Sequence, residues 1–367
     1  MTRPAQTSLS EQQLERYQRH LQLPNFGSAG QCKLSQAKVV IVGMGGLGCP
    51  VALYLTAAGV GQITLVDGDQ VSLSNLQRQV LFTEANIGNN KAEAAATHLQ
   101  ERNSQPHVIA IQEPLTQSNA AQIVETADLV IDCSDNFYAR YLINDTCHQQ
   151  GTAWIYASVL QQQGQVALFE PHFSCFRCLF PRLNSAPDCN QAGVLGVLPG
   201  ILGSMQASLA IQYLSDSKLP TNNQLTQISN WPLQMRTIEL AQAPDCKLCH
   251  GQATAQELQE DYHTSPTTDL ESLLLSAKDL ATMQHSAAVI LIDVRQEEEH
   301  KKHNIGGINI PLSRLKEEFE IQPQAAYAFY CETGKRSLYA LEQLISQQPS
   351  ILDHCQLYSL AGGIARL

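Results

Sequence analysis

A glycine-rich loop between an apolar strand and a helix is the feature that most limits the fold of this chain. Residues 37–43 read AKVVIVG, the loop GMGGLG occupies 43–48, and an apolar helical pattern continues to about residue 58. Glycines let backbone N–H groups approach a phosphate closely, and the helix N-terminus favours negative charge. The sequence therefore predicts a nucleotide-binding α/β sheet that begins here.

Strand and helix patterns alternate after this loop. The segments are 62–67, 91–103, 107–112, 119–127 and 128–133, of which the second and fourth read as helices. This alternation predicts a doubly wound parallel sheet with its ligand at the carboxyl ends of the strands.

The pattern changes in the middle of the chain. Antiparallel strand pairs are indicated by 152–159, 164–170, 224–230 and 233–241, and an apolar helix is predicted at 200–214 between them. We expect the first domain to cover 1–250. A polar stretch without apolar periodicity predicts a linker at 251–270, followed by a small α/β domain at 271–367.

Composition excludes several classes of function. The 367 residues carry a formal charge of −11, so no global basic field favours nucleic acid or an anionic membrane. We find neither a secretory signal nor an uninterrupted apolar run of membrane-spanning length. The odd count of 11 cysteines indicates metal ligation or thiol chemistry rather than a disulfide framework. We therefore expect a cytoplasmic protein.

The residues around the glycine loop indicate which nucleotide is bound. The spacing of Gly43, Gly45 and Gly48, with Asp67 at the end of the next strand, is also typical of NAD sites. However, polar and charged residues then follow at positions near the expected phosphates: Asp69, Asn75, Arg78, Gln79, Lys91, Asp132, Asp135 and Asn136. Cations with a carboxylate that can hold Mg²⁺ favour phosphoryl chemistry, which hydride transfer does not require.

Five segments resemble, in order and spacing, the MoeB/ThiF family of bacterial relatives of ubiquitin-activating enzymes. They are RYQRH, GMGGLG, VSLSNLQRQ, NNKAEAA and DCSDN, and the resemblance covers about residues 10–250. It implies a Rossmann-like, E1-type fold that binds ATP and Mg²⁺. It also implies that the C-terminal Gly-Gly of a ubiquitin-like sulfur-carrier protein attacks the α-phosphate, giving an acyl adenylate and pyrophosphate.

The resemblance also assigns roles to single residues. Gly46 lies against the nucleotide, Asp67 binds the ribose, Lys91 neutralises phosphate and Asp135 positions Mg²⁺. Arg19 reaches into the site of a partner protomer, which implies a homodimer. The complete set of expected nucleotide-binding residues is Gly43, Gly45, Gly46, Asp67, Asp69, Ser74, Asn75, Arg78, Gln79, Lys91, Asp135 and Asn136.

Two CxxC motifs predict a metal site. Cys175 and Cys178 in CFRC, with Cys246 and Cys249 in CKLC, supply four thiolates for tetrahedral Zn²⁺, and a closed site of this kind is structural. The alternative is two unrelated pairs of thiols. Cys189 differs, because its polar stretch RLNSAPDCNQAGVLG predicts exposure. The resemblance implies that Cys189 can bond covalently to the activated carrier, and an incidental loop thiol is the alternative.

The C-terminal residues predict a second thiol site. In YCETGKRS, Cys331 lies between a strand and a helix, where loop N–H groups, the helix N-terminus, Lys335 and Arg336 can stabilise an anionic sulfur. This segment, with DVR, HNIGGINIP and LAGGI, resembles a rhodanese sulfurtransferase domain. The resemblance implies that Cys331 carries sulfur and that Arg336 orients an anionic donor.

Three further expectations concern this C-terminal domain. We expect His300 and His303 to be structural. We also expect Glu332 to oppose a thiolate at Cys331, and the domain to be shorter than usual because the chain ends at AGGIARL. A catalytically inactive docking module is the alternative interpretation of this domain.

Together these patterns predict a bifunctional adenylyltransferase and sulfurtransferase. Its carrier would be ThiS-like or MoaD-like, and its sulfur donor a cysteine desulfurase or thiosulfate. The product would serve thiamine or molybdopterin synthesis, with GVLG and CLFP slightly favouring the thiamine branch. The alternatives are an NAD-dependent oxidoreductase with an appended domain, and a zinc-stapled docking scaffold.

Overall fold

The chain divides into two compact units, Met1–Leu258 and Gln259–Leu367. The computed structural model describes residues 8–181, 193–215, 223–254, 258, 273–285, 289–319, 321–322, 325–347 and 351–366. Cys189 and most of the predicted linker at 251–270 lie outside the described residues.

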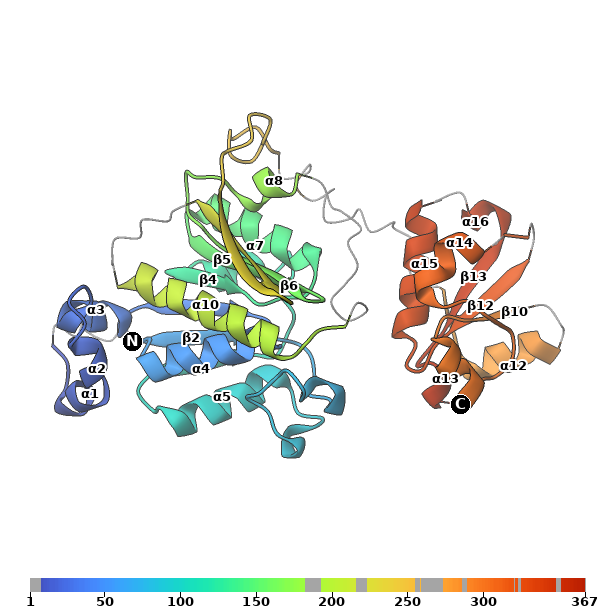
Figure 1. Ribbon diagram of the computed structural model, residues 1–367, viewed down its shortest axis with the longest axis horizontal. Coiled ribbons are helices and arrows are strands. Elements are labelled where there is room, and N and C mark those ends of the chain that lie inside the picture. The colour runs from blue at the N-terminus through green and yellow to red at the C-terminus, as the bar shows by residue number, and fades with distance from the viewer. Residues whose placement is uncertain are drawn as a thin grey trace. The chain divides into compact units, whose positions relative to one another are not determined.

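An eight-stranded sheet forms the centre of the first unit, in the order β3-β2-β1-β4-β5-β6-β7-β8 (Figure 1). The first five strands in this order are parallel, which confirms the predicted doubly wound sheet. Their bounds are β1 Lys38–Val42, β2 Gln62–Val66, β3 His107–Ile111, β4 Leu129–Asp132 and β5 Ala153–Leu160. Strands of this kind are rich in β-branched residues because helices bury both faces.

Antiparallel strands extend the same sheet. They are β6 Gln163–Phe169, β7 Gln224–Asn230 and β8 Leu233–Glu239. The predicted strand pairs are thus confirmed, and they continue from the parallel half through β5. All residues of the edge strand β8 are exposed.

Alternation along β5 shows that helices cover both faces of the sheet. Ile155 and Ala157 belong to the core beneath α10, whereas Trp154 and Tyr156 contact Phe176 on the opposite face. The helices of this unit beyond its N-terminal segment are α4 Gly48–Ala58, α5 Lys91–Arg102, α6 Ala120–Val124, α7 Phe137–Gln150, α8 Phe176–Leu179 and α10 Val197–Leu214, with 3-10 turns at Leu73–Asn75 and Glu84–Asn86.

Helix α10 is long and apolar enough, by length and composition alone, to cross a membrane. From the sequence we expect no segment of this length. However, α10 packs against α4, β5 and β6, and its buried residues Leu198, Leu202, Ala207 and Ala210 belong to the main core. These contacts are those of the core helix of a globular domain.

Three N-terminal helices precede the sheet, α1 Glu11–Arg16, α2 Gln18–Leu21 and α3 Gly27–Leu34. Tyr17 anchors them. Its side chain lies against Gly59, and its hydroxyl accepts a bond of 3.0 Å from Asn103. Gly59 caps the C-terminal end of α4, so this anchor lies at the opposite end of α4 from the glycine loop.

The second unit has a five-stranded parallel sheet in the order β11-β10-β12-β13-β9. The strands are β9 Leu274–Leu275, β10 Ile290–Asp293, β11 Ile308–Asn309, β12 Ala326–Tyr330 and β13 Gln356–Leu360. Phe329 and Ala328 face different core clusters, so both faces of the sheet are covered. The helices are α12 Ala277–His285, α13 Glu297–Lys302, α14 Leu315–Glu318, α15 Lys335–Gln347 and α16 Ile351–His354, with 3-10 turns at Leu312–Arg314 and Ile364–Arg366.

Candidate functional site

The glycine loop joins β1 to α4 at the carboxyl edge of the sheet. Gly43 has a φ of 95°, and a Cβ there would lie 2.6 Å from the carbonyl oxygen of Cys133. A Cβ on Gly48 would collide with the carbonyl oxygen of Gly43. A Cβ on Gly46 would lie 3.4 Å from Cγ of Arg78. Hence the loop needs glycine at its ends, and its middle lies beside a predicted phosphate-binding arginine.

Asp67, at the end of β2, fixes this loop. Its Oδ2 accepts a bond of 2.6 Å from the N–H of Met44, and its Oδ1 accepts one of 2.8 Å from the N–H of Asp69. Burial raises the pKa of this carboxyl above its usual value. From the sequence we expect Asp67 to bind a ribose, and we do not predict that it also holds the glycine loop in place.

Lys91 lies beside the same edge. It is the first residue of α5, its side chain is only 8% exposed, and its Nζ lies 2.8 Å from Oδ2 of Asp69, whose side chain is 76% exposed. Asn90 caps α5 and also donates to the carbonyl oxygen of Asp67. The lysine is therefore held in a fixed position, while its acidic partner is open to solvent.

The segment after β2 supplies the remaining predicted phosphate-binding residues. Arg78 is half-buried and donates a bond of 3.1 Å to the carbonyl oxygen of Ser74, and Asn75 accepts one from the N–H of Ser72. Gln79 is 3% exposed, and its Oε1 is a buried oxygen without a hydrogen-bond partner among the described residues. A Cβ on Gly45 would lie 3.9 Å from its Nε2. The unpaired Oε1 of Gln79, beside the loop, can accept a hydrogen bond from a polar ligand.

The DCSDN segment follows β4, whose neighbour is β1. Asp132 is fully buried, and burial raises its pKa to about 6. It accepts bonds from the N–H and hydroxyl of Ser134, so it is a structural residue of this turn. Asp135 is exposed, and Asn136 caps α7. Since Val42 pairs with both Val66 and Asp132, the glycine loop, Asp67 and Asp135 follow strands that end together.

A cavity of about 580 Å³ lies next to Arg78. Its wall includes Val80 and the first turns of α10, among them Gly196, Val197 and Gly200. These lining residues are not predicted from the sequence, because the apolar start of a helix has no chemical signal of its own.

Arg19 does not belong to the nucleotide site of its own chain. It lies in α2, and its exposed guanidinium donates to Oε1 of Gln22. Tyr17 fixes this segment at the far end of α4, and the 11 residues of that helix span roughly 16 Å. The expected position of Arg19 in the site of a partner protomer stays a prediction.

The two CxxC motifs come together in the first unit. The sulfur atoms of Cys175 and Cys246 are 3.6 Å apart, those of Cys178 and Cys249 are 3.5 Å apart, and all four lie within 4.8 Å of one another. Four sulfurs at about 2.3 Å from a tetrahedral metal lie about 3.8 Å apart, so this cluster fits a metal ion.

Buried polar side chains support this cysteine cluster. Arg177, between the cysteines of the first motif, forms an ion pair of 2.7 Å with Asp145 on α7. Asn144 accepts a bond of 2.8 Å from the N–H of Phe176. Both contacts fix the first CxxC motif to α7.

In the second unit, Cys331 directly follows β12, and α15 begins four residues later. The residue is fully buried, whereas Glu332 and Thr333 after it are exposed. The hydroxyl of Ser337 lies 3.7 Å from the sulfur of Cys331 and 2.8 Å from the hydroxyl of Ser359 on β13. The predicted strand, loop and helix around the cysteine are therefore confirmed.

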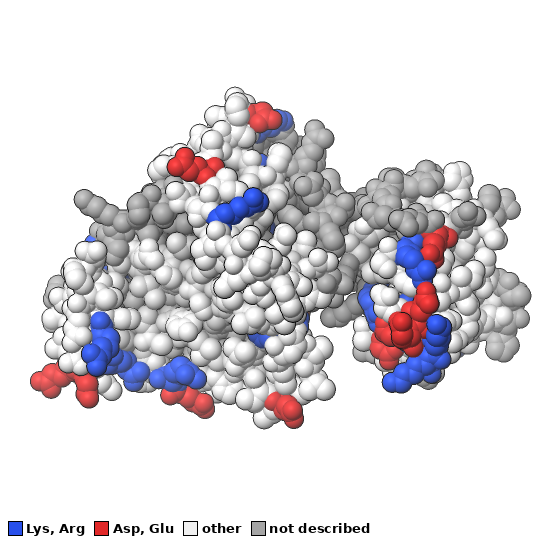
Figure 2. All heavy atoms as spheres, viewed as in Figure 1, with Lys and Arg blue, Asp and Glu red and all other residues white. Residues whose placement is uncertain are grey.

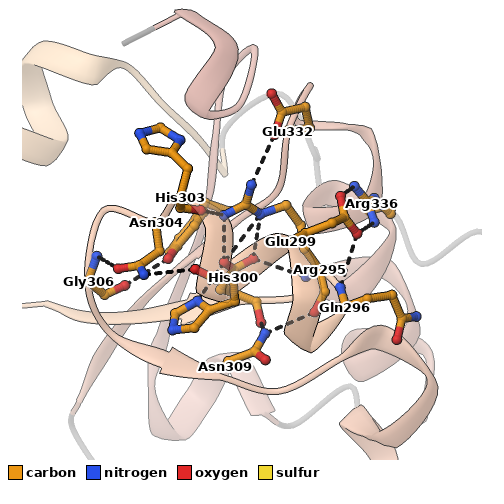
Figure 3. A network of polar contacts seen from close by, with 12 residues as sticks. Arg295, Gln296, Glu299, His300, His303, Asn304, Gly306, Asn309, Glu332 and Arg336 are labelled. Carbon is orange, nitrogen blue, oxygen red and sulfur yellow. Dashed lines mark hydrogen bonds and ion pairs between the residues drawn. The ribbon is translucent and has the colours of Figure 1, made fainter.

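Figure 3 shows a network of charged side chains around Arg295. The guanidinium of Arg295 donates to both oxygens of Asp293 and to the carbonyl oxygen of His303, and its Nη1 lies 3.0 Å from Oε2 of Glu332. The ring of His300 lies 2.8 Å from Asp293. The side chain of His300 thus helps to build the domain, whereas His303 contributes its backbone carbonyl and has an exposed side chain.

Two residues of the cysteine loop have partners that the sequence did not predict. The carboxylate of Glu332 pairs with Arg295 at 3.0 Å while its side chain stays 52% exposed, so the expected opposition to a thiolate stays a prediction. Arg336 was expected to orient an anionic donor, but its two Nη atoms donate to both oxygens of Glu299 at 2.8 and 2.7 Å. Sequence reasoning missed Glu299 and Arg295, since they lie 37 residues from their partners.

We expect acid to weaken the second unit through these pairs. The pKa of Glu299 lies below its usual value because of Arg336. Burial raises the pKa of Asp293, but the bonds from Arg295 and His300 outweigh it and leave the pKa lowered. Unfolded carboxyl groups titrate near pH 4, so the ion pairs stabilise the unit above about pH 5, and this stability is lost as pH falls through the folded pKa values.

Urea titrations at pH 7 and pH 3, followed by methyl NMR signals of the second unit, test this expectation. Glu299→Gln should reduce the loss of unfolding free energy between the two pH values by up to about 1 kcal/mol, since this pair is partly exposed. Glu298→Gln, an exposed residue of the same helix, is the control. An unchanged loss in Glu299→Gln would contradict the assignment.

Comparison with known proteins agrees with this geometry. The model of the ThiF family matches residues 17–248, which is more than half of the chain. The chain belongs to the ThiF family. A rhodanese-like domain matches residues 276–366 of this ThiF-family chain. The two matches correspond to the nucleotide-binding sheet and to the unit that carries Cys331.

Relatives of this ThiF-family chain include proteins with both parts. It is 33% identical to the zebrafish (Danio rerio) adenylyltransferase and sulfurtransferase MOCS3, over 98% of this chain and 86% of that protein. It is 37% identical to the SAMP-activating enzyme E1 of Haloferax volcanii, over 72% of this chain and 99% of that protein. It is 40% identical to the sulfur carrier protein adenylyltransferase of Thermus thermophilus, over 68% of this chain and 95% of that protein.

Solved structures give the same fold for the first unit. The crystal structure of E. coli MccB with MccA-N7isoASN has a TM-score of 0.58 and 26% identity, covering 66% of this chain and 75% of that one. The same enzyme has also been crystallised with ATP, with a TM-score of 0.56 over 64% of this chain and 74% of that one at 26% identity. Family membership favours phosphoryl chemistry over the NAD-dependent alternative.

Proposed function

We propose that this enzyme adenylates the C-terminal carboxylate of a ubiquitin-like sulfur-carrier protein and converts it to a thiocarboxylate with sulfur carried on Cys331. One observation carries the proposal. A ThiF-family glycine loop flanked by Arg78 and Lys91 occurs in the same chain as a rhodanese-like unit with a cysteine between strand and helix. Adenylyltransferase and sulfurtransferase are the two activities in the names of its MOCS3 relatives.

The residues around the glycine loop suit the adenylation step. A carboxylate that approaches a polyphosphate is repelled, so positive charge must screen it before in-line attack. Lys91 and Arg78 supply that charge, and Gln79 offers a polar group with unused hydrogen-bonding capacity. Asp135 would hold Mg²⁺, which would screen the departing pyrophosphate. The cavity beside Arg78 has room for an extended Gly-Gly tail without side chains.

The second step transfers sulfur. A persulfide on Cys331 attacks the acyl carbonyl, AMP leaves, and an acyl disulfide joins the carrier to Cys331. A second thiol then attacks the sulfur of Cys331, so that the thiocarboxylate leaves and a disulfide forms. Cys189 is our candidate for this thiol, and a small external thiol is the alternative.

Zinc is the metal that the four cysteines would hold. Two thiolate pairs at tetrahedral spacing are typical of closed structural sites. Bound Zn²⁺ would cross-link segments 71 residues apart and fix the end of the antiparallel strands.

Removal of one ligand tests the zinc site. Cys246→Ala should lose stoichiometric zinc, measured by elemental mass spectrometry, and the Tm of the first unit should fall by roughly 10 °C. Cys32→Ala, a half-buried cysteine outside the cluster, should change neither value. Full zinc content in the Cys246 variant would show that the ion binds elsewhere.

The homodimer and the cytoplasmic location belong to this proposal. On the face drawn in Figure 2, the middle of the first unit carries few charged side chains. A groove of about 630 Å³ lies between the N-terminal helices and α10, with exposed Leu23 and Tyr54 in its wall. Such a surface suits a second copy of the chain, whose Arg19 would then complete the site.

Mass spectrometry of candidate carriers tests the proposed function directly. A ThiS-like and a MoaD-like protein are each incubated with the enzyme, ATP, Mg²⁺, a thiol and either thiosulfate or a persulfide. A mass gain that matches replacement of one oxygen by sulfur identifies the carrier and supports both half-reactions. Absence of pyrophosphate exchange with every Gly-Gly carrier, together with NADH binding, would refute the proposal.

A further inference from the structure

The arginines of the Cys331 region are already paired with carboxylates. Arg336 makes two parallel bonds with Glu299, and Arg295 lies between Asp293 and Glu332 (Figure 3). Paired bonds of this kind hold a guanidinium in one orientation and occupy the edge that would otherwise grip an anion. Oppositely charged side chains also lie side by side on the face of this unit drawn in Figure 2.

The charged side chains around Cys331 have no net positive charge that would bind an anion. The two arginines carry two positive charges, and Asp293, Glu299 and Glu332 carry three negative ones. The ring of His300 also lies 2.8 Å from Oδ2 of Asp293. The two arginines therefore leave no excess positive charge in this network, and Glu332, which directly follows the nucleophile in the chain, is 52% exposed.

Sulfur donors differ in the charge that they bring to this site. Thiosulfate carries two negative charges. When the Cys331 thiolate attacks its outer sulfur, the S–S bond breaks and sulfite leaves with two negative charges. An alkyl persulfide carries at most one charge on its sulfurs, and attack on its outer sulfur releases a thiolate. Both reactions yield the Cys331 persulfide without an external oxidant or reductant.

We propose that Glu332 and Glu299 are specificity-determining residues that select uncharged or weakly charged persulfide donors and discriminate against dianionic donors such as thiosulfate. Glu332 repels an incoming dianion, and Glu299 occupies the guanidinium of Arg336 that would bind it. The inference rests on the proposed role of Cys331 as the sulfur carrier.

Matched substitutions in the full chain test the inference by steady-state kinetics with cyanide as sulfur acceptor. The two donors are thiosulfate and 2-hydroxyethyl persulfide, whose carbon chain is uncharged. Glu332→Gln and Glu299→Gln should each raise kcat/KM for thiosulfate about tenfold, mainly through KM, because each change removes one like charge near the dianion. The value for the persulfide should change less than about threefold.

Glu297→Gln is the control, because Glu297 lies on the same helix and also pairs with an arginine, Arg314. Glu297→Gln should leave kcat/KM unchanged for both donors. Equal changes of kcat/KM for both donors in Glu332→Gln and Glu299→Gln, or an unchanged kcat/KM for thiosulfate, would overturn the inference.

A second measurement does not depend on sulfur transfer. Iodoacetate and iodoacetamide are the same electrophile with and without a negative charge, and mass spectrometry of the Cys331 peptide gives both alkylation rates. The ratio of the iodoacetate to the iodoacetamide rate should rise several-fold in Glu332→Gln and stay constant in Glu297→Gln. If no donor supports sulfur transfer, the proposed function fails, whereas a constant ratio in Glu332→Gln refutes the charge selection itself.

Discussion

Arg78→Ala is expected to reduce carrier-dependent exchange between ATP and pyrophosphate by about 10²–10³-fold, the usual cost of removing one transition-state contact. The side chain lies against the glycine loop, next to Gly46 and in the wall of the cavity lined by α10. No other arginine or lysine is described in the wall of that cavity. Its removal would leave Lys91 as the only one of the two proposed cationic side chains that screens the phosphates.

Two measurements separate this effect from misfolding. Sulfur transfer from a persulfide to cyanide occurs in the second unit and should stay within twofold of wild type in Arg78→Ala. Arg102→Ala is the matched control, because Arg102 is an exposed arginine in the last turn of α5, the helix that begins with Lys91. Exchange at the wild-type rate in Arg78→Ala would remove this residue from the mechanism.

Cys331→Ser is expected to give the reciprocal result. It should abolish sulfur transfer to cyanide and thiocarboxylate formation, because a serine oxygen cannot carry a sulfane sulfur. Exchange of pyrophosphate should be unchanged, since the nucleotide site lies in the other unit. The substitution is nearly isosteric in a fully buried position, so folding should be preserved.

Cys355→Ala is the control for Cys331→Ser. Cys355 is another buried cysteine of the second unit, and its thiol donates to the backbone carbonyl of Ile351. This variant should keep both activities. Persulfide formation on a residue other than Cys331, detected by mass spectrometry of the trapped enzyme, would falsify the assignment of the sulfur carrier.

Much of the fold could be predicted because its signals are local. The run of apolar β-branched residues before GMGGLG, and its repetition through β2, β3 and β4, marks buried parallel strands. Helix α7 carries no such signal, and the sequence analysis does not predict it. Its buried face includes Arg140, Asn144 and Asp145, so the apolar period is weak. These side chains contact Ser134, Phe176 and Arg177, respectively.

The parts of the candidate sites with a local sequence signal could also be predicted, whereas those that depend on distant residues could not. CxxC motifs are short, specific patterns, and their four sulfurs meet in the structure. The carboxylates that occupy Arg295 and Arg336 could not be found from the sequence, because opposite charges 37 residues apart have many possible partners. The lining of the cavity by α10 was missed for a similar reason, since glycine and valine show no chemistry until a neighbouring side chain faces them.

By itself, the sequence determined that this chain has a glycine loop on a parallel sheet, two cysteine pairs that can share a metal, and a cysteine between a strand and a helix. These features depend on residues close together in the chain. Only the tertiary structure decided the state of the charged groups: that Asp67 holds the loop, that Lys91 is paired and buried, and that both arginines near Cys331 are neutralised. The physical reason is that an ion pair depends on distance and burial, which packing sets.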